Sequence, residues 1–184
     1  FDSDLYRETL ASNTFESFDL FHDVDCIYHL AATGVSPRSA GWDELLEINV
    51  NLSLSICQLA HRIGCRLICA GSFAEYGLSA NSYSFIPPYA SLQPTFPYAA
   101  SKAAASTLSI SYALSEGIDL AYLRIFNAFG DGQHESNLWP SLRLAAMSGH
   151  DFPLSPGSQI RDFVSISSVV RQLYFISTLS KLHF

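Results

Sequence analysis

Tyr98 and Lys102 stand four residues apart within one segment rich in alanine and serine, and a phenol beside an ammonium can take part in acid–base chemistry. Pro97 suits the first turn of a helix, and neither proline nor glycine follows until Gly117, so the segment predicts a helix. Residues four apart share a helix face, and an ammonium beside a phenol lowers the phenol pKa. Tyr98 could then act as a general acid or base. Such a pair also arises by chance, so its spacing alone leaves the function open.

The elements that would position this pair alternate along the chain between short apolar runs and longer helical patterns. This alternation predicts βαβ units, and therefore an α/β fold with a parallel sheet. Strands are predicted at 24–32, 65–72, 118–126 and 161–167. Those in apolar runs are expected to be buried. Helices are predicted at 42–64, 97–117, 137–149 and 169–179, with Pro140 in a first turn.

Ligands of parallel sheets bind beyond the carboxyl ends of the strands. The segments that follow the predicted strands are therefore the places to search for a site. They read AATGVSPR from Ala31, GSFAEYG from Gly71 and NAFGDGQ from Asn127.

Composition limits the classes of protein. Hydrophobic residues make up 48% and charged residues 15% of 184, which is typical of a globular chain rather than a disordered one. The net charge of −7 and the lack of a basic run argue against nucleic acid or a membrane as partner. The histidines and cysteines lack metal-ligand spacing, so no metal is expected. The four cysteines lie in apolar segments without a C-x-x-C pair, which favours free thiols in a cytoplasmic protein.

Six motifs along the chain occur in the order seen in a known family. They are HLAA, INVN, GSFAEYG, PYAASK, LRIFNAFG and GSQIRDFV. In these motifs the chain, from about Asp4 to Val170, resembles the extended short-chain dehydrogenases/reductases, which include nucleotide-sugar epimerases, dehydratases and ketoreductases. The resemblance implies a Rossmann-like doubly wound sheet, NAD or NADP as cofactor, a nucleotide-sugar substrate and a homodimer.

The resemblance also implies roles for particular residues. Tyr98 matches the catalytic tyrosine, Lys102 the lysine that binds the nicotinamide ribose and lowers the tyrosine pKa, and Ser72 the residue that hydrogen-bonds the reacting sugar oxygen. The remaining matches are Ala31 and Ala32 beside the cofactor, Asn49 as a structural or proton-relay residue, and Asn127 and Arg161 at the substrate diphosphate.

The glycine-rich dinucleotide loop of this fold is not found before the first predicted strand. We therefore expect an N-terminally truncated Rossmann fold. Its domains would be a partial NAD(P)-binding domain at 1–130 and the start of a substrate-binding region at 131–184, interleaved with the last Rossmann elements.

The kind of sugar chemistry is narrowed by the residues after Ser72. Dehydratase relatives carry an Asp-Glu pair there, whereas this chain has Phe73 and Ala74, with Glu75 one place late. A 4-ketoreductase or epimerase is therefore favoured over a dehydratase, with a non-catalytic relative as the alternative. A serine hydrolase is disfavoured because GSFAEYG lacks the G-x-S-x-G elbow.

Overall fold

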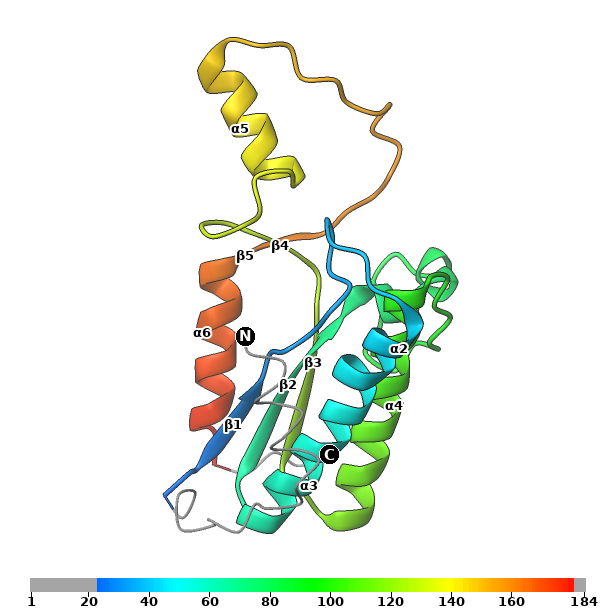
Figure 1. The fold of residues 1–184 in the computed structure, drawn as a ribbon, viewed down its shortest axis with the longest axis vertical. Coiled ribbons are helices and arrows are strands. Elements are labelled where there is room, and N and C mark those ends of the chain that lie inside the picture. Colours follow the sequence, from blue (N-terminus) through cyan, green and yellow to red (C-terminus); the bar gives the residue numbers. More distant parts are fainter. Residues whose placement is uncertain (1–22, 181–184) are drawn as a thin grey trace.

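The computed structural model describes residues 23–180, in which strands and helices alternate as predicted (Figure 1). The strands are β1 (Cys26–His29), β2 (Arg66–Ser72), β3 (Leu120–Ile125), β4 (Asn127–Phe129) and β5 (Phe163–Ser165). The helices are α2 (Trp42–Leu45), η2 (Leu46–Asn51), α3 (Leu52–Ile63), η3 (Phe73–Tyr76), η4 (Leu78–Ser82), α4 (Pro97–Glu116), α5 (Leu138–Ser148) and α6 (Ile166–Thr178).

The main sheet contains three parallel strands in the order β1-β2-β3 (Figure 1). Parallel neighbours need long crossover connections, and here α2–α3 and then α4 supply them. β4 and β5 form a second, two-stranded parallel sheet. The predicted α/β fold with a parallel sheet is therefore confirmed.

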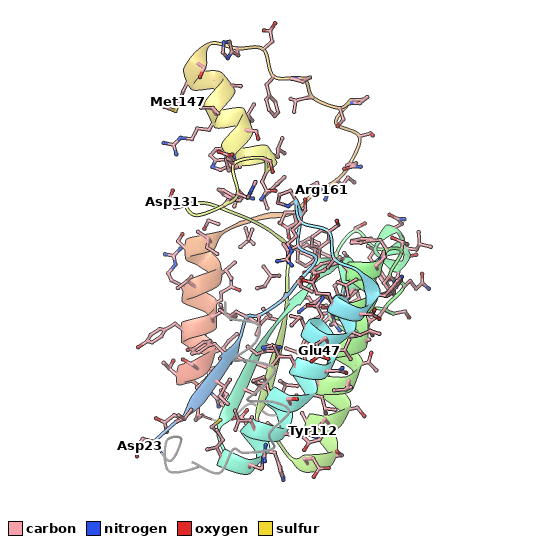
Figure 2. All side chains as sticks on the ribbon, in the orientation of Figure 1. Asp23, Glu47, Tyr112, Asp131, Met147 and Arg161 are labelled. Carbon is pink, nitrogen blue, oxygen red and sulfur yellow. The ribbon has the colours of Figure 1, made fainter. Side chains whose placement is uncertain are left out.

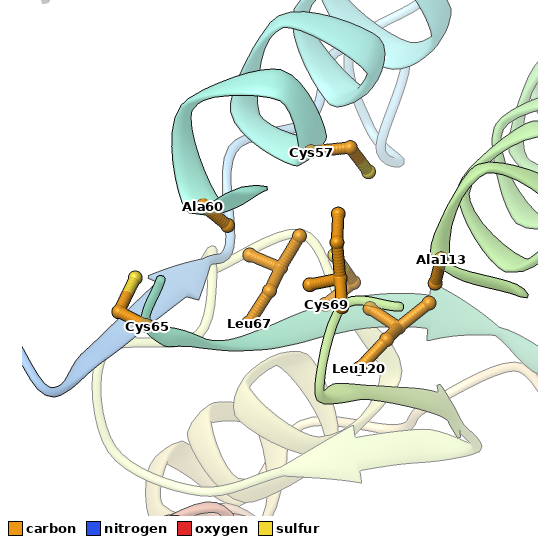
Figure 3. Close-up of a cluster of buried hydrophobic side chains, with 8 residues drawn as sticks. Cys57, Ala60, Cys65, Leu67, Cys69, Ala113 and Leu120 are labelled. Atoms are coloured by element: carbon orange, nitrogen blue, oxygen red, sulfur yellow. The ribbon is translucent and has the colours of Figure 1, made fainter. Parts of the chain in front are cut away.

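Helices cover both faces of the main sheet, so β2 is apolar on both sides. On one face, Leu67 and Cys69 pack with residues of α3 and α4 (Figure 3). On the other face, Ile68 packs with Val169 and Leu173 of α6. This arrangement explains why β2 is a continuous apolar run rather than an alternating one. All four cysteines are free, and Cys57, Cys65 and Cys69 are buried.

α4 spans the residues predicted for it, with Pro97 in its first turn and Gly117 in the left-handed conformation after its last residue. Its buried positions are mostly small: Ala99, Ser101, Ala103, Ala105, Ser106, Ser109 and Ala113. The helix contacts α2, η2 and α3 as well as the sheet. The small side chains allow these elements to approach closely, which places the start of α4 beside the end of β2.

Two local predictions need correction. The 24–32 segment was expected to be a buried strand, but β1 covers only Cys26–His29, and Tyr28 is 42% exposed. In the described sheet β1 is an edge strand, so one of its sides is uncovered. The predicted helix 42–64 forms, but η2 within it is a π-helical stretch, a feature often found at functional sites.

α5 stands apart from the main sheet, whereas β5 and α6 return to it (Figure 1). α5 buries none of its side chains. The proposed division near residue 130 stays a prediction. Within residues 23–180, no helix combines the length and apolarity needed to cross a membrane.

Candidate active site

Ser72 is the last residue of β2 and the N-cap of the short helix η3. Its hydroxyl oxygen accepts the N–H of Ala74 at 3.2 Å, and the Glu75 carboxylate accepts the N–H of Ser72 at 2.7 Å. This reciprocal capping box fixes the turn and holds the Ser72 hydroxyl at the carboxyl end of the sheet.

Tyr98 lies in the first turn of α4, close enough for its phenol to share a hydrogen bond with the Ser72 side chain. Burial raises the pKa of Tyr98, the hydrogen bond with Ser72 lowers it, and the charge of Glu75 raises it. The net direction is upward. The phenol is therefore protonated at neutral pH in this structure.

Lys102 lies one turn further along α4 and is only 4% exposed. Its Nζ donates a 2.7 Å hydrogen bond to the carbonyl of Ala70 in β2. Burial lowers the pKa of Lys102, while the charges of Glu75 and Cys69 raise it. In this structure the pKa of Tyr98 is raised on balance and the ammonium of Lys102 is directed at Ala70, so the tuning of Tyr98 by Lys102 stays a prediction.

Asn49 is fully buried in η2 and ties three segments together. Its Oδ1 accepts the N–H of Thr33 at 2.9 Å, and its Nδ2 donates to the Thr33 carbonyl at 3.1 Å and to the Ser101 hydroxyl at 2.9 Å. Ser101 in turn donates to the carbonyl of Tyr98. These bonds support a structural role, because they fix the loop after β1 against the start of α4.

Ala31 and Ala32 directly precede Thr33, so Asn49 also holds the segment that carries them. Ala31 is partly buried and Ala32 is exposed. Nearby, the imidazole of His29 bonds the Ser53 hydroxyl at 3.0 Å. Burial and the charge of Lys102 lower the pKa of His29 to about 4, so this imidazole is neutral at pH 7.

Asn127 and Arg161 are brought together although 34 residues separate them. Arg161 donates to the Asn127 side chain at 3.4 Å, and Asn127 donates to the Asp162 carbonyl at 2.9 Å. Arg161 is exposed and lies near the junction between the long segment after α5 and the body of the molecule (Figure 2). Asn127 begins β4, just beyond the end of β3.

Sequence reasoning did not assign a role to Glu75, Tyr122 or Arg124, which form a group behind Ser72. Glu75 is buried, and the other two are partly buried. Glu75 has no exposed surface and forms a 2.7 Å ion pair with Arg124. The available signal was an acidic residue inside an otherwise apolar strand–turn motif, followed later by an arginine within a predicted strand.

The family model of the NAD dependent epimerase/dehydratase family matches residues 7–181. The chain belongs to this family. Among the curated relatives, UDP-glucuronic acid decarboxylase 1 of Danio rerio is 29% identical over 165 residues, which is 84% of this chain and 38% of that protein. UDP-glucuronic acid decarboxylase 6 of Arabidopsis thaliana is 30% identical, over 84% of this chain and 47% of that protein. The chain thus spans less than half the length of either relative.

Similar solved structures confirm the Rossmann-like fold. MoeE5 in complex with UDP-glucuronic acid and NAD aligns with a TM-score of 0.77 and 26% identity, over 92% of this chain and 57% of that one. A UDP-N-acetylglucosamine 4-epimerase of Methanobrevibacter ruminantium M1 aligns with a TM-score of 0.74 and 27% identity, over 86% and 53%. Epimerases, decarboxylases and dehydratases all occur among the relatives.

Proposed function

We propose that the protein containing this chain is an NAD-dependent 4-ketoreductase or epimerase of a nucleotide-activated sugar. The observation that carries the proposal is the convergence of Ser72, Tyr98 and Lys102 at the carboxyl end of the parallel sheet. These are a hydroxyl, a phenol and an ammonium from two different elements. Membership of an NAD-dependent family adds to it.

Proton transfer at a sugar oxygen is assigned to Tyr98. Its raised pKa keeps the phenol protonated, so it can donate its proton to a carbonyl oxygen of a keto sugar. The Ser72 hydroxyl, which shares a hydrogen bond with that phenol, orients the same oxygen. This direction of proton transfer is the one a ketoreductase requires.

Lys102, together with Ala31 and Ala32, is proposed to hold the cofactor. An ammonium has three donors, and the one hydrogen bond that Lys102 makes within residues 23–180 is to Ala70. The remaining donors of this buried group suit the hydroxyls of a ribose. NAD, when bound, would supply or accept the hydride.

Asn127 and Arg161 are proposed to bind the diphosphate of the substrate. Arg161 is a cation on an exposed segment, and its bond with Asn127 brings an amide to the same place. Guanidinium groups bind phosphates through paired hydrogen bonds. The relative MoeE5 is recorded with UDP-glucuronic acid and, in a second structure, with UDP-glucose, so these two compounds are the first to test.

A dehydratase remains disfavoured, for a structural reason. Elimination of water needs an additional acid and base at the sugar. Phe73 stacks on Phe126, Ala74 has no acidic group, and the Glu75 carboxylate is fully buried against Arg124. None of the three can offer a carboxylate to a substrate.

The test is to incubate the protein with UDP-glucuronic acid or UDP-glucose and NAD, or with the matching 4-keto sugar and NADH, and to follow products by NMR. We expect epimerised or reduced sugar. A protein that binds NAD and nucleotide sugars without any turnover would favour the alternative of a non-catalytic relative.

The protein is further proposed to be cytoplasmic and to form a homodimer. Free cysteines support a reducing compartment. The homodimer is proposed through the exposed surfaces of α4 and of the helical segment 42–63. Light scattering that shows a strict monomer would contradict it.

A further inference from the structure

Glu75 stands out as the acidic residue that is fully buried within residues 23–180. It is not part of the proposed chemistry, because no surface of its side chain is exposed. Charged side chains are rarely buried without a partner, so the question is what this carboxylate does there.

The contacts of Glu75 join the end of β2 to β3. One carboxylate oxygen, Oε1, accepts the backbone N–H of Ser72 at 2.7 Å and the hydroxyl of Tyr122 at 3.2 Å. The other, Oε2, accepts Nε of Arg124 at 2.7 Å. We call these residues, Ser72, Glu75, Tyr122 and Arg124, the Glu75 cluster.

Arg124 extends the cluster to α4 and to the loop before it. Its Nη2 donates to the Ser106 hydroxyl at 2.7 Å, one helical turn beyond Lys102, and its Nη1 donates to the Pro88 carbonyl at 3.1 Å. The Tyr122 hydroxyl also lies 3.4 Å from the Lys102 carbonyl. The cluster therefore links the strand end that carries Ser72 to the helix that carries Tyr98 and Lys102.

Gly71 leaves the space that this cluster occupies. A Cβ at Gly71 would lie 2.2 Å from the Tyr122 ring and 2.7 Å from Glu75 Oε1. Any other residue at position 71 would displace the carboxylate or the ring. The lack of a side chain at Gly71 therefore makes room for the buried carboxylate of Glu75.

We propose that Glu75 is a positioning residue, which together with Arg124 holds Ser72 at a fixed place relative to Tyr98 and Lys102. The inference rests on the proposed function for its purpose, but the positioning itself is a property of the fold. Reacting groups that shift by a fraction of an ångström lose rate without losing binding, so the effect belongs in kcat.

A matched control lies at the other end of the same two strands. Arg66 and Asp119 also form a 2.7 Å ion pair between the β2 and β3 regions, with side chains 9% and 21% exposed. Asp119→Asn removes a comparable charge far from Ser72. It should lower the melting temperature without altering the site.

The experiment compares Glu75→Gln with Asp119→Asn by hydrogen–deuterium exchange of the peptide around 70–77 and by steady-state kinetics. In Glu75→Gln the new amide N–H faces Arg124 Nε, and we expect exchange at 70–77 to accelerate and kcat to fall at least about tenfold, with KM nearly unchanged. Asp119→Asn should show neither effect. Unchanged exchange at 70–77 in Glu75→Gln would overturn the proposal.

A double variant, Glu75→Leu with Arg124→Met, separates positioning from folding. Removing both charges should restore much of the stability, because no buried charge is left unpaired, yet kcat should stay low. Recovery of kcat together with stability would also overturn the proposal. If the unmodified protein has no turnover, the proposed function fails, and exchange at 70–77 alone then decides whether Glu75 positions Ser72.

Discussion

An arginine–carboxylate ion pair lies at each end of β2 and β3, and the two arginines differ in their other contacts. At the amino end, Arg66 pairs with Asp119 and also donates hydrogen bonds to the carbonyls of Ile176 and Leu179, where α6 ends. At the carboxyl end, Arg124 pairs with Glu75 and also donates hydrogen bonds to the Ser106 hydroxyl and the Pro88 carbonyl.

The difference shows that the pair itself does not define the role. A cation at a helix C-terminus satisfies carbonyls that lack partners, so Arg66 fastens α6 to the sheet. Arg124 lies instead behind Ser72, Tyr98 and Lys102. We therefore expect changes at the amino end to affect stability alone, and changes at the carboxyl end to affect stability and turnover.

The largest effect on turnover is expected for Tyr98→Phe. The change removes one hydroxyl from the proposed proton donor and should lower kcat by about 10²–10⁴-fold. The melting temperature should change little, which circular dichroism can check. Turnover within about threefold of the unmodified protein would show that the phenol does not transfer the proton.

The largest effect on stability is expected for Arg124→Met. Glu75 would remain buried and unpaired, which costs about 3–5 kcal/mol of unfolding free energy. Arg66→Met should cost less, because Asp119 is 21% exposed and water can solvate it. Urea unfolding of both variants measures the difference. A larger loss for Arg66→Met would reverse the comparison.

Acid should lower the free energy of unfolding through His29, the last residue of β1. Its pKa is lowered to about 4 in the folded protein, so the unfolded chain binds the proton first as pH falls. The contribution of neutral His29 to stability is fully present above about pH 6.5. It is lost progressively between pH 6.5 and 4, by about 3 kcal/mol in all. His29→Gln should flatten the pH dependence of the melting temperature in this range.

The smallest effect is expected for Ser106→Ala. Arg124 would lose a 2.7 Å acceptor on α4 that is fully buried, which costs about 1–3 kcal/mol. Ser111→Ala on the exposed side of the same helix is the control and should change the unfolding free energy by less than about 0.5 kcal/mol. Equal effects would mean that the bond to Ser106 contributes nothing.

The sequence was sufficient for the frame of the site. Alternating strand and helix patterns predicted a parallel sheet, and that sheet requires the segments after Ala70 and Ile125 to meet at one edge. The convergence of Ser72 with the α4 helix follows from this topology.

The electrostatics of the site could not be predicted in the same way. The Glu75–Arg124 pair joins residues 49 positions apart, so it depends on the final packing of β3 against η3. The pKa of Tyr98 depends on how deeply its phenol is buried, which spacing along a helix does not reveal. β4 has only three residues and is defined by its pairing with β5.

Ser72 and Tyr98 are proposed to act together on one oxygen of a nucleotide sugar. A crystal structure of the protein with NAD and UDP-glucuronic acid or UDP-glucose tests it most directly. We predict one sugar oxygen within hydrogen-bonding distance of both the Tyr98 and Ser72 hydroxyls, and the ribose of NAD on Lys102. A bound nucleotide sugar with no oxygen in reach of either hydroxyl would show that these two residues do not act on the sugar.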